Sequence, residues 1–211
     1  QIYAQYPFCE IEEVNDYTNA DVLKRGFAGT ELQLLRSDII PIKTFKEFES
    51  DSLAGIFSVM TKAEEDEQAW IQVFVEPIAD DWKLNFYRTW KMKFNNIKLY
   101  FRFKNYFKLK SAKALRETEK EAYKHKAEHH TYKTAIRIAY SAQTKEKAQQ
   151  KLSVLVKAYL QFNTIDLNGF KPLKISRLQG FFKSYQERIM PKGFDLSSLE
   201  LSSIYHFPHP E

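Results

Sequence analysis

An almost unbroken apolar run from Ala69 to Ile78 constrains the fold of this 211-residue sequence more than any other feature. Trp70 and Val73 have the aromatic or β-branched side chains that strands favour, and Pro77 marks the end of the run because proline cannot continue a hydrogen-bonded ladder. Such a run predicts the clearest strand of the chain. The rest of the chain must therefore supply the neighbouring strands and the helices that cover them.

Further strands and helices follow one plan on both sides of the middle of the chain. Alternating apolar residues predict strands, and apolar residues three or four positions apart predict helices. Residues 180–189 fit neither pattern. The expected strands cover residues 8–14, 27–35, 69–78, 132–140 and 170–176, the last with Pro172 at a sheet edge; the expected helices cover residues 45–60, 113–128 and 144–162, and Ser197 or Ser198 caps a short final turn.

This order of elements predicts the α+β class, with strand–strand–helix–strand units that form two ferredoxin-like halves. We divide the chain into a first α+β half (1–80), an aromatic-basic and charged helical segment (81–130) and a second α+β half (131–211) that ends in a linker to a missing domain. Both ends are expected to be excision points, because the sequence starts without Met and stops abruptly after Pro210.

The composition points to a packed domain in a reducing compartment. A chain that is 44% hydrophobic and 15% aromatic has the opposite composition to a disordered segment. The net charge of +5 permits contact with phosphate or anionic lipid but does not require it. Cys9 is the single cysteine and is expected to be a buried structural thiol. No apolar run reaches the roughly 20 residues that cross a bilayer.

The segment from Lys83 to Lys110 is the strongest candidate for a binding surface. It contains nine Lys or Arg residues and nine aromatic residues, and it lacks Asp and Glu. Such a segment can lie on an anionic membrane, stack the bases of single-stranded nucleic acid, or pack against another domain or subunit while its cations reach solvent. The predicted surface consists of Arg88, Trp90, Lys91, Lys93, Phe94, Lys98, Arg102, Lys104, Tyr106 and Lys108.

Two clusters of titratable residues have simpler interpretations than chemistry. His125 and His129 have a spacing that can bind zinc from one helix face, but no further ligands cluster beside them, so an exposed helix end is expected. Asp80 and Asp81 lack the partner group that would separate the pKa values of two carboxyl groups, and they are expected to cap a turn. We therefore predict no catalytic residue, no metal site and no cofactor.

Five short strings occur together in this sequence. They are Ile2–Pro7 (IYAQYP), Glu10–Tyr17 (EIEEVNDY), Asp51–Ile56 (DSLAGI), Glu67–Val73 (EQAWIQV) with Pro77, and Leu199–Pro208 (LELSSIYHFP). In this order they resemble the region that precedes the ATPase core in conjugation-type (type IV secretion) ATPases, which are HerA/FtsK-like proteins of the TraG and TraC groups, especially those of small uncultivated bacteria. The resemblance covers nearly the whole chain and implies an N-terminal α+β domain in front of a P-loop motor.

The motor's nucleotide site does not carry over to this chain. A phosphate-binding loop needs Gly-x-x-x-x-Gly-Lys-Ser/Thr, and Lys192–Gly193 reverses that order. The resemblance implies a non-catalytic accessory or assembly domain, cytoplasmic and peripheral to the inner face of the cell membrane. Its expected partners are other domains or subunits of a secretion ATPase, with an anionic membrane surface, nucleic acid and oligomerisation as further options. The alternative is a free-standing module that binds nucleic acid or an anionic membrane.

Overall fold

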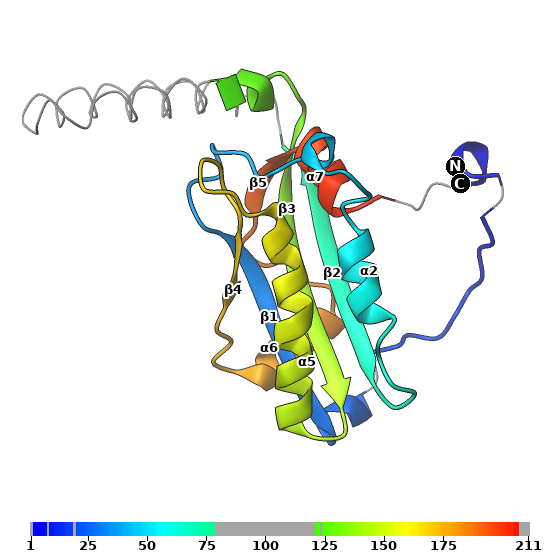
Figure 1. Cartoon of the computed structure of the whole chain (residues 1–211). Coiled ribbons are helices and arrows are strands. Elements are labelled where there is room, and N and C mark those ends of the chain that lie inside the picture. The colour runs from blue at the N-terminus through cyan, green and yellow to red at the C-terminus, as the bar shows by residue number, and fades with distance from the viewer. Residues whose placement is uncertain (1, 8, 19, 79–120, 123, 207–211) are drawn as a thin grey trace, which may run out of the picture.

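The computed structural model describes residues 2–7, 9–18, 20–78, 121–122 and 124–206 (Figure 1). Within them the chain is of the α+β class. The strands are β1 (Gly26–Leu34), β2 (Gln68–Pro77), β3 (Thr131–Ala142), β4 (Phe170–Leu173) and β5 (Phe194–Ser197); the α-helices are α1 (Ile2–Gln5), α2 (Ala54–Met60), α5 (Lys145–Ala158), α6 (Leu178–Gln186) and α7 (Ser198–Ile204); and the 3₁₀ turns are η1 (Ala20–Leu23), η2 (Phe45–Glu47) and η4 (Tyr159–Phe162).

The five strands form one antiparallel sheet around β3. The order across the sheet is β2-β3-β1-β4, and β5 also pairs with β3. β2 follows β3 along ten residue pairs, from Gln68↔Ser141 to Pro77↔Tyr132. The other side of β3 pairs with β1 near its end and with β5 near its start. Two separate ferredoxin-like halves are not confirmed, because β3 lies in the second half of the chain but pairs with both strands of the first.

Helices α5 and α2 cover one face of the sheet, which faces the viewer in Figure 1. On this front face Ile136, Ile138 and Tyr140 of β3 are almost completely buried against Leu155 of α5. Alternate residues of a strand point to opposite faces, so every second side chain of β3 enters this core. Helix α5 starts where the Thr144 hydroxyl accepts the Lys147 backbone N–H at 3.2 Å.

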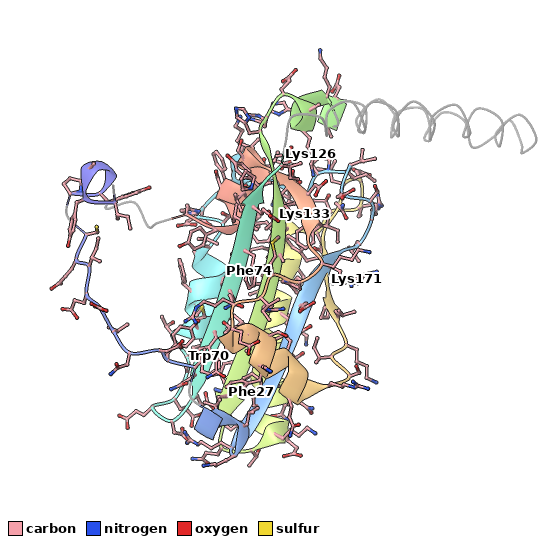
Figure 2. All side chains as sticks on the ribbon, turned by 180° about the vertical axis from the view of Figure 1, so that it is seen from behind. Phe27, Trp70, Phe74, Lys126, Lys133 and Lys171 are labelled. Atoms are coloured by element: carbon pink, nitrogen blue, oxygen red, sulfur yellow. The ribbon has the colours of Figure 1, made fainter. Side chains whose placement is uncertain are left out.

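Helix α6 covers part of the opposite face, seen in Figure 2, and closes a smaller aromatic core there. Phe27 of β1 and Trp70 of β2 pack with Phe182 and Tyr185, with ring centroids 5.3–5.9 Å apart. Gly29 of β1 lies directly under the Phe181 ring, where a Cβ atom would overlap the ring. A glycine at this point therefore lets the helix approach the sheet.

A buried ion pair joins the segments at the upper end of the sheet in Figure 1. The Lys126 ammonium lies 2.9 Å from the Glu200 carboxylate, and both side chains are only 1% exposed. Lys126 also donates to the backbone carbonyls of Asp38 (2.6 Å) and Asp195 (2.8 Å). Glu200 accepts from the backbone N–H groups of Ile42 and Ser197 and from the Ser197 hydroxyl. This Lys126–Glu200 network connects three segments that are far apart in sequence: residues 38–42, Lys126 and residues 195–200.

Most of the expected elements are confirmed, with boundaries shifted by a few residues. The expected strands at 27–35, 69–78, 132–140 and 170–176 correspond to β1, β2, β3 and β4. The expected helix at 144–162 is α5 followed by the turn η4, and Ser197 is the N-cap of α7.

Three expectations are wrong, and one segment that the sequence left unassigned forms a helix. Residues 9–14 form no strand, because no neighbouring strand pairs with them. The helix expected at 45–60 is split into η2 and α2, since Phe48 turns away from the helical path to contact the Phe162 ring at 5.4 Å. Residues 178–186, partly unassigned from the sequence, form α6. Cys9 is half-buried rather than buried.

Candidate functional site

The binding surface predicted from the sequence lies outside the described residues, and so do Asp80 and Asp81. No placement is therefore assigned to its ten members, and its role stays a prediction. Of the expected helix at 113–128, residues 121–122 and 124–127 are described and are helical. The undescribed residues are Arg88, Trp90, Lys91, Lys93, Phe94, Lys98, Arg102, Lys104, Tyr106 and Lys108.

A pocket of about 470 Å³ lies beside the Lys126–Glu200 network and contains the two predicted histidines. The rings of His125 and His129 are 5.4 Å apart at their centroids, and His125 is exposed. Among the described residues no group of three or more His, Cys, Asp or Glu side chains is placed to hold a metal ion. Lys126 and Glu200, which line this pocket, are paired with each other and stabilise the fold.

A second cluster of charges fastens the start of β2 to α5. The buried Glu67 carboxylate accepts from the Tyr140 hydroxyl at 2.7 Å and lies 3.0 and 3.1 Å from the ammonium groups of Lys147 and Lys151. Burial alone would raise the pKa of Glu67, but these hydrogen bonds, together with one from the Glu64 backbone, outweigh it and hold the pKa at about 2. The carboxylate stays ionised, and its role is to fix this corner of the sheet.

A second hollow runs along the outer edge of β2. This edge groove has a volume of about 740 Å³ and lies between β2 and the ends of α2 and α7. Its walls are mainly apolar and aromatic, and His206, at one end, lies 3.2 Å from the Asp51 carboxylate. The lining residues are Tyr17, Leu53, Ile56, Phe57, Met60, Tyr159, Ile204, Tyr205, His206 and residues 68–73 of β2.

β2 and β4, which lie at the two ends of the strand order, differ in how their outer edges are protected. β4 contains Lys171 and Pro172, and Lys174 follows it, which are residues that discourage a further strand from pairing. β2 contains no charge and no proline from Ala69 to Val75. In the described part of the chain no strand pairs with its outer side. The β2 edge therefore offers unpaired backbone groups beside an apolar groove.

This arrangement is suited to binding an extended segment. An open edge supplies main-chain hydrogen bonds, and pockets beside it accept alternate side chains of the added strand. Phe57 of α2 is 43% exposed and Tyr205 after α7 is 52% exposed, so apolar surface is available on the groove walls.

The face of the sheet that α6 partly covers carries cations. Acidic side chains on the same face neutralise two of them. The Arg137 guanidinium lies 3.0 Å from Glu31, and Lys133 lies 3.1 Å from Asp195. Figure 2 shows Lys133 and Phe74 on this face, where Phe74 stacks with Arg137 at 5.2 Å. Paired cations attract phosphate weakly, so this face favours nucleic acid less than a basic aromatic sheet would.

Comparison with known proteins places the chain in a family. Its whole length, residues 1–211, matches the family described as a domain of unknown function, DUF8128. The chain belongs to this family. No curated protein and no solved structure matches the chain. Within the described residues of this DUF8128 chain, no helix is long and apolar enough to cross a membrane.

Sequence reasoning missed the edge groove, although part of its signal is visible. The absence of charge from Ala69 to Val75 distinguishes β2 from β4 in the sequence itself. That β2 lies at the edge of the sheet depends on pairing between distant segments, which periodicity does not report. Tyr205 and His206 join the groove only because α7 ends beside α2, and nothing local to them predicts this.

Proposed function

We propose that this chain is a non-catalytic assembly domain, and that it serves as an accessory domain of a type IV secretion or conjugation-type ATPase. In this role it positions the motor in an oligomer or at the inner face of the cell membrane. The observation that carries the assembly role is the unprotected β2 edge beside the edge groove. The link to a secretion ATPase rests on the five sequence strings that resemble the pre-motor region.

Charge pairing favours a protein partner for the described surface. Arg137 and Lys133 are neutralised by neighbouring acids, and the groove is lined by apolar and aromatic groups. The alternative, a module for nucleic acid or anionic membrane, depends on residues 83–110. Binding of the chain to single-stranded DNA and to anionic vesicles over a salt series tests it, because phosphate-driven affinity falls steeply with salt.

The full gene product provides the test of the proposed function. A P-loop ATPase domain is expected after Glu211, and Val75→Lys on the β2 edge should abolish substrate transfer while ATP hydrolysis continues. Val154→Lys is the matched control, because Val154 is 49% exposed and Val75 is 46% exposed, whereas Val154 lies on α5 and not on the β2 edge. A gene product without an ATPase domain, or normal transfer by Val75→Lys, contradicts the proposal.

A further inference from the structure

An extended arm, residues 9–16, projects from the domain beside the β2 edge. It forms no helix or strand, and residues 10–15 make no hydrogen bond with the described part of the chain. Its apolar side chains are exposed, with Ile11 at 48% and Val14 at 77%. In Figure 1 the arm is blue; it leaves beside the lower end of β2 and runs away from the sheet. An extended segment with exposed apolar side chains can become a strand when it pairs with the open edge of a sheet.

The base of the arm is held firmly. The Asp16 carboxylate accepts the backbone N–H and the hydroxyl of Thr18 at 2.9 and 2.6 Å, and both terminal nitrogens of Arg188 donate to it at 3.0 Å. The next residue, Tyr17, packs edge-on against Trp70 with ring centroids 5.4 Å apart. These contacts fix the direction in which the arm leaves, away from the edge of its own β2.

The arm matches the β2 edge in length and in pairing capacity. About eight extended residues span about 26 Å, against about 33 Å for the ten residues of β2. From Ala69 to Val75 the edge lacks charge and proline, and the arm also lacks proline, so both can form a continuous ladder. The arm carries Glu10, Glu12 and Glu13, which meet no like charge on this stretch of the edge. Within the described residues the arm pairs with no strand, and no strand pairs with the outer side of β2.

We propose that the arm of one copy adds as a strand to the β2 edge of a second copy, and that the exchange is reciprocal. The proposal rests on the assembly role proposed for that edge and names its partner. A two-fold exchange uses the same pair of surfaces twice, as closed dimers do. Each copy then contributes about eight arm residues and ten edge residues, close to the about 20–30 residues per side of a standard stable interface.

Mass measurement of the 211-residue chain by light scattering tests the proposal. Wild type and Val154→Lys should have twice the monomer mass at micromolar concentration. Val75→Lys, and a variant lacking residues 1–15, should both be monomers with the wild-type circular dichroism spectrum. A monomeric wild type, or a dimer that survives removal of the arm, overturns the exchange.

A mixing experiment identifies the two surfaces as partners. The variant without the arm keeps an intact edge, and Val75→Lys keeps an intact arm. Together they should form a one-to-one complex, which neither forms alone. Failure to form it, with both variants folded, overturns the proposal. That result leaves the proposed function standing if Val75→Lys still abolishes transfer in the full gene product, because the edge then binds a different partner.

Discussion

Replacing Glu200 with glutamine tests whether the buried ion pair holds the upper end of the domain together. The substitution keeps the shape of the side chain but leaves the Lys126 ammonium, labelled in Figure 2, without its counter-charge. It also places an amide N–H₂ where a carboxylate oxygen accepted a backbone N–H, from either Ile42 or Ser197. Both consequences lower the free energy of unfolding, because each leaves a buried polar group without a suitable partner.

The expected loss is large for a single atom exchange. Breaking a buried pair by removing one partner costs about 3–5 kcal/mol. For a domain of this size that corresponds to a fall in Tm of about 6–20 °C. Urea unfolding of the 211-residue chain, followed by circular dichroism, measures the change in the free energy of unfolding.

Two further variants make the result specific to this pair. Lys133→Met removes the partner of Asp195 in a partly exposed pair and should cost less than about 1 kcal/mol. The double variant Lys126→Met/Glu200→Gln should lose less than the sum of the two single variants by about 0.5–3 kcal/mol. A Glu200→Gln loss as small as that of Lys133→Met, or strict additivity in the double variant, would show that the network is not a stabilising unit.

Three other predictions follow from contacts described above. Glu67 has a folded pKa of about 2, below its ordinary value of 4.5, so its contribution to stability is present above pH 4.5 and lost as the pH falls toward 2; urea unfolding of Glu67→Gln should therefore depend less on pH across that window than wild type. Gly29→Ala places a methyl group into the Phe181 ring, and thermal unfolding should show a loss of about 1–3 kcal/mol, whereas Gly180→Ala should not, since its added Cβ meets only ordinary contacts. Thr144→Ala removes the hydroxyl that caps α5 and should cost about 1 kcal/mol in the same assay, while Thr144→Ser should restore stability.

The sequence predicted the elements whose signals are local. The apolar spacing of the helix expected at 144–162 agrees with its burial, and Leu155 is completely buried. The uncharged run of β2 predicts the strand but not its burial, because β2 lies at the edge of the sheet and Trp70 is its one buried side chain. Leu160, near the end of the helix expected at 144–162, is 43% exposed, because the helix tightens into η4 and rotates this side chain outward. Helix α6 also has regularly spaced apolar residues, but they span only two turns and the helix contains Gly180, so its sequence signal is weak. These apolar residues are Leu178, Phe181, Phe182 and Tyr185.

The parts that were not predicted depend on contacts between distant segments. Residues 8–14 alternate like a strand, yet a strand exists only where another strand pairs with it. Asn168 gives no local signal, but its buried amide donates to the carbonyls of Ser37 and Ile40 and so shapes the loop after β1. The Lys126–Glu200 network has the same character, because its two members are 74 positions apart.

The pairing of β2 with β3 has a consequence for how the domain folds. The two strands lie in the register of a hairpin, but about fifty residues separate Pro77 from Thr131. Closing such a loop costs about 2 kcal/mol more entropy than closing a four-residue turn. We therefore expect β3 and α5, which are adjacent in the chain, to form the folding nucleus, and β2 to dock after the rate-limiting step. φ-values near zero for Val73→Ala and well above zero for Leu155→Ala are the expected signature; the reverse order would refute it.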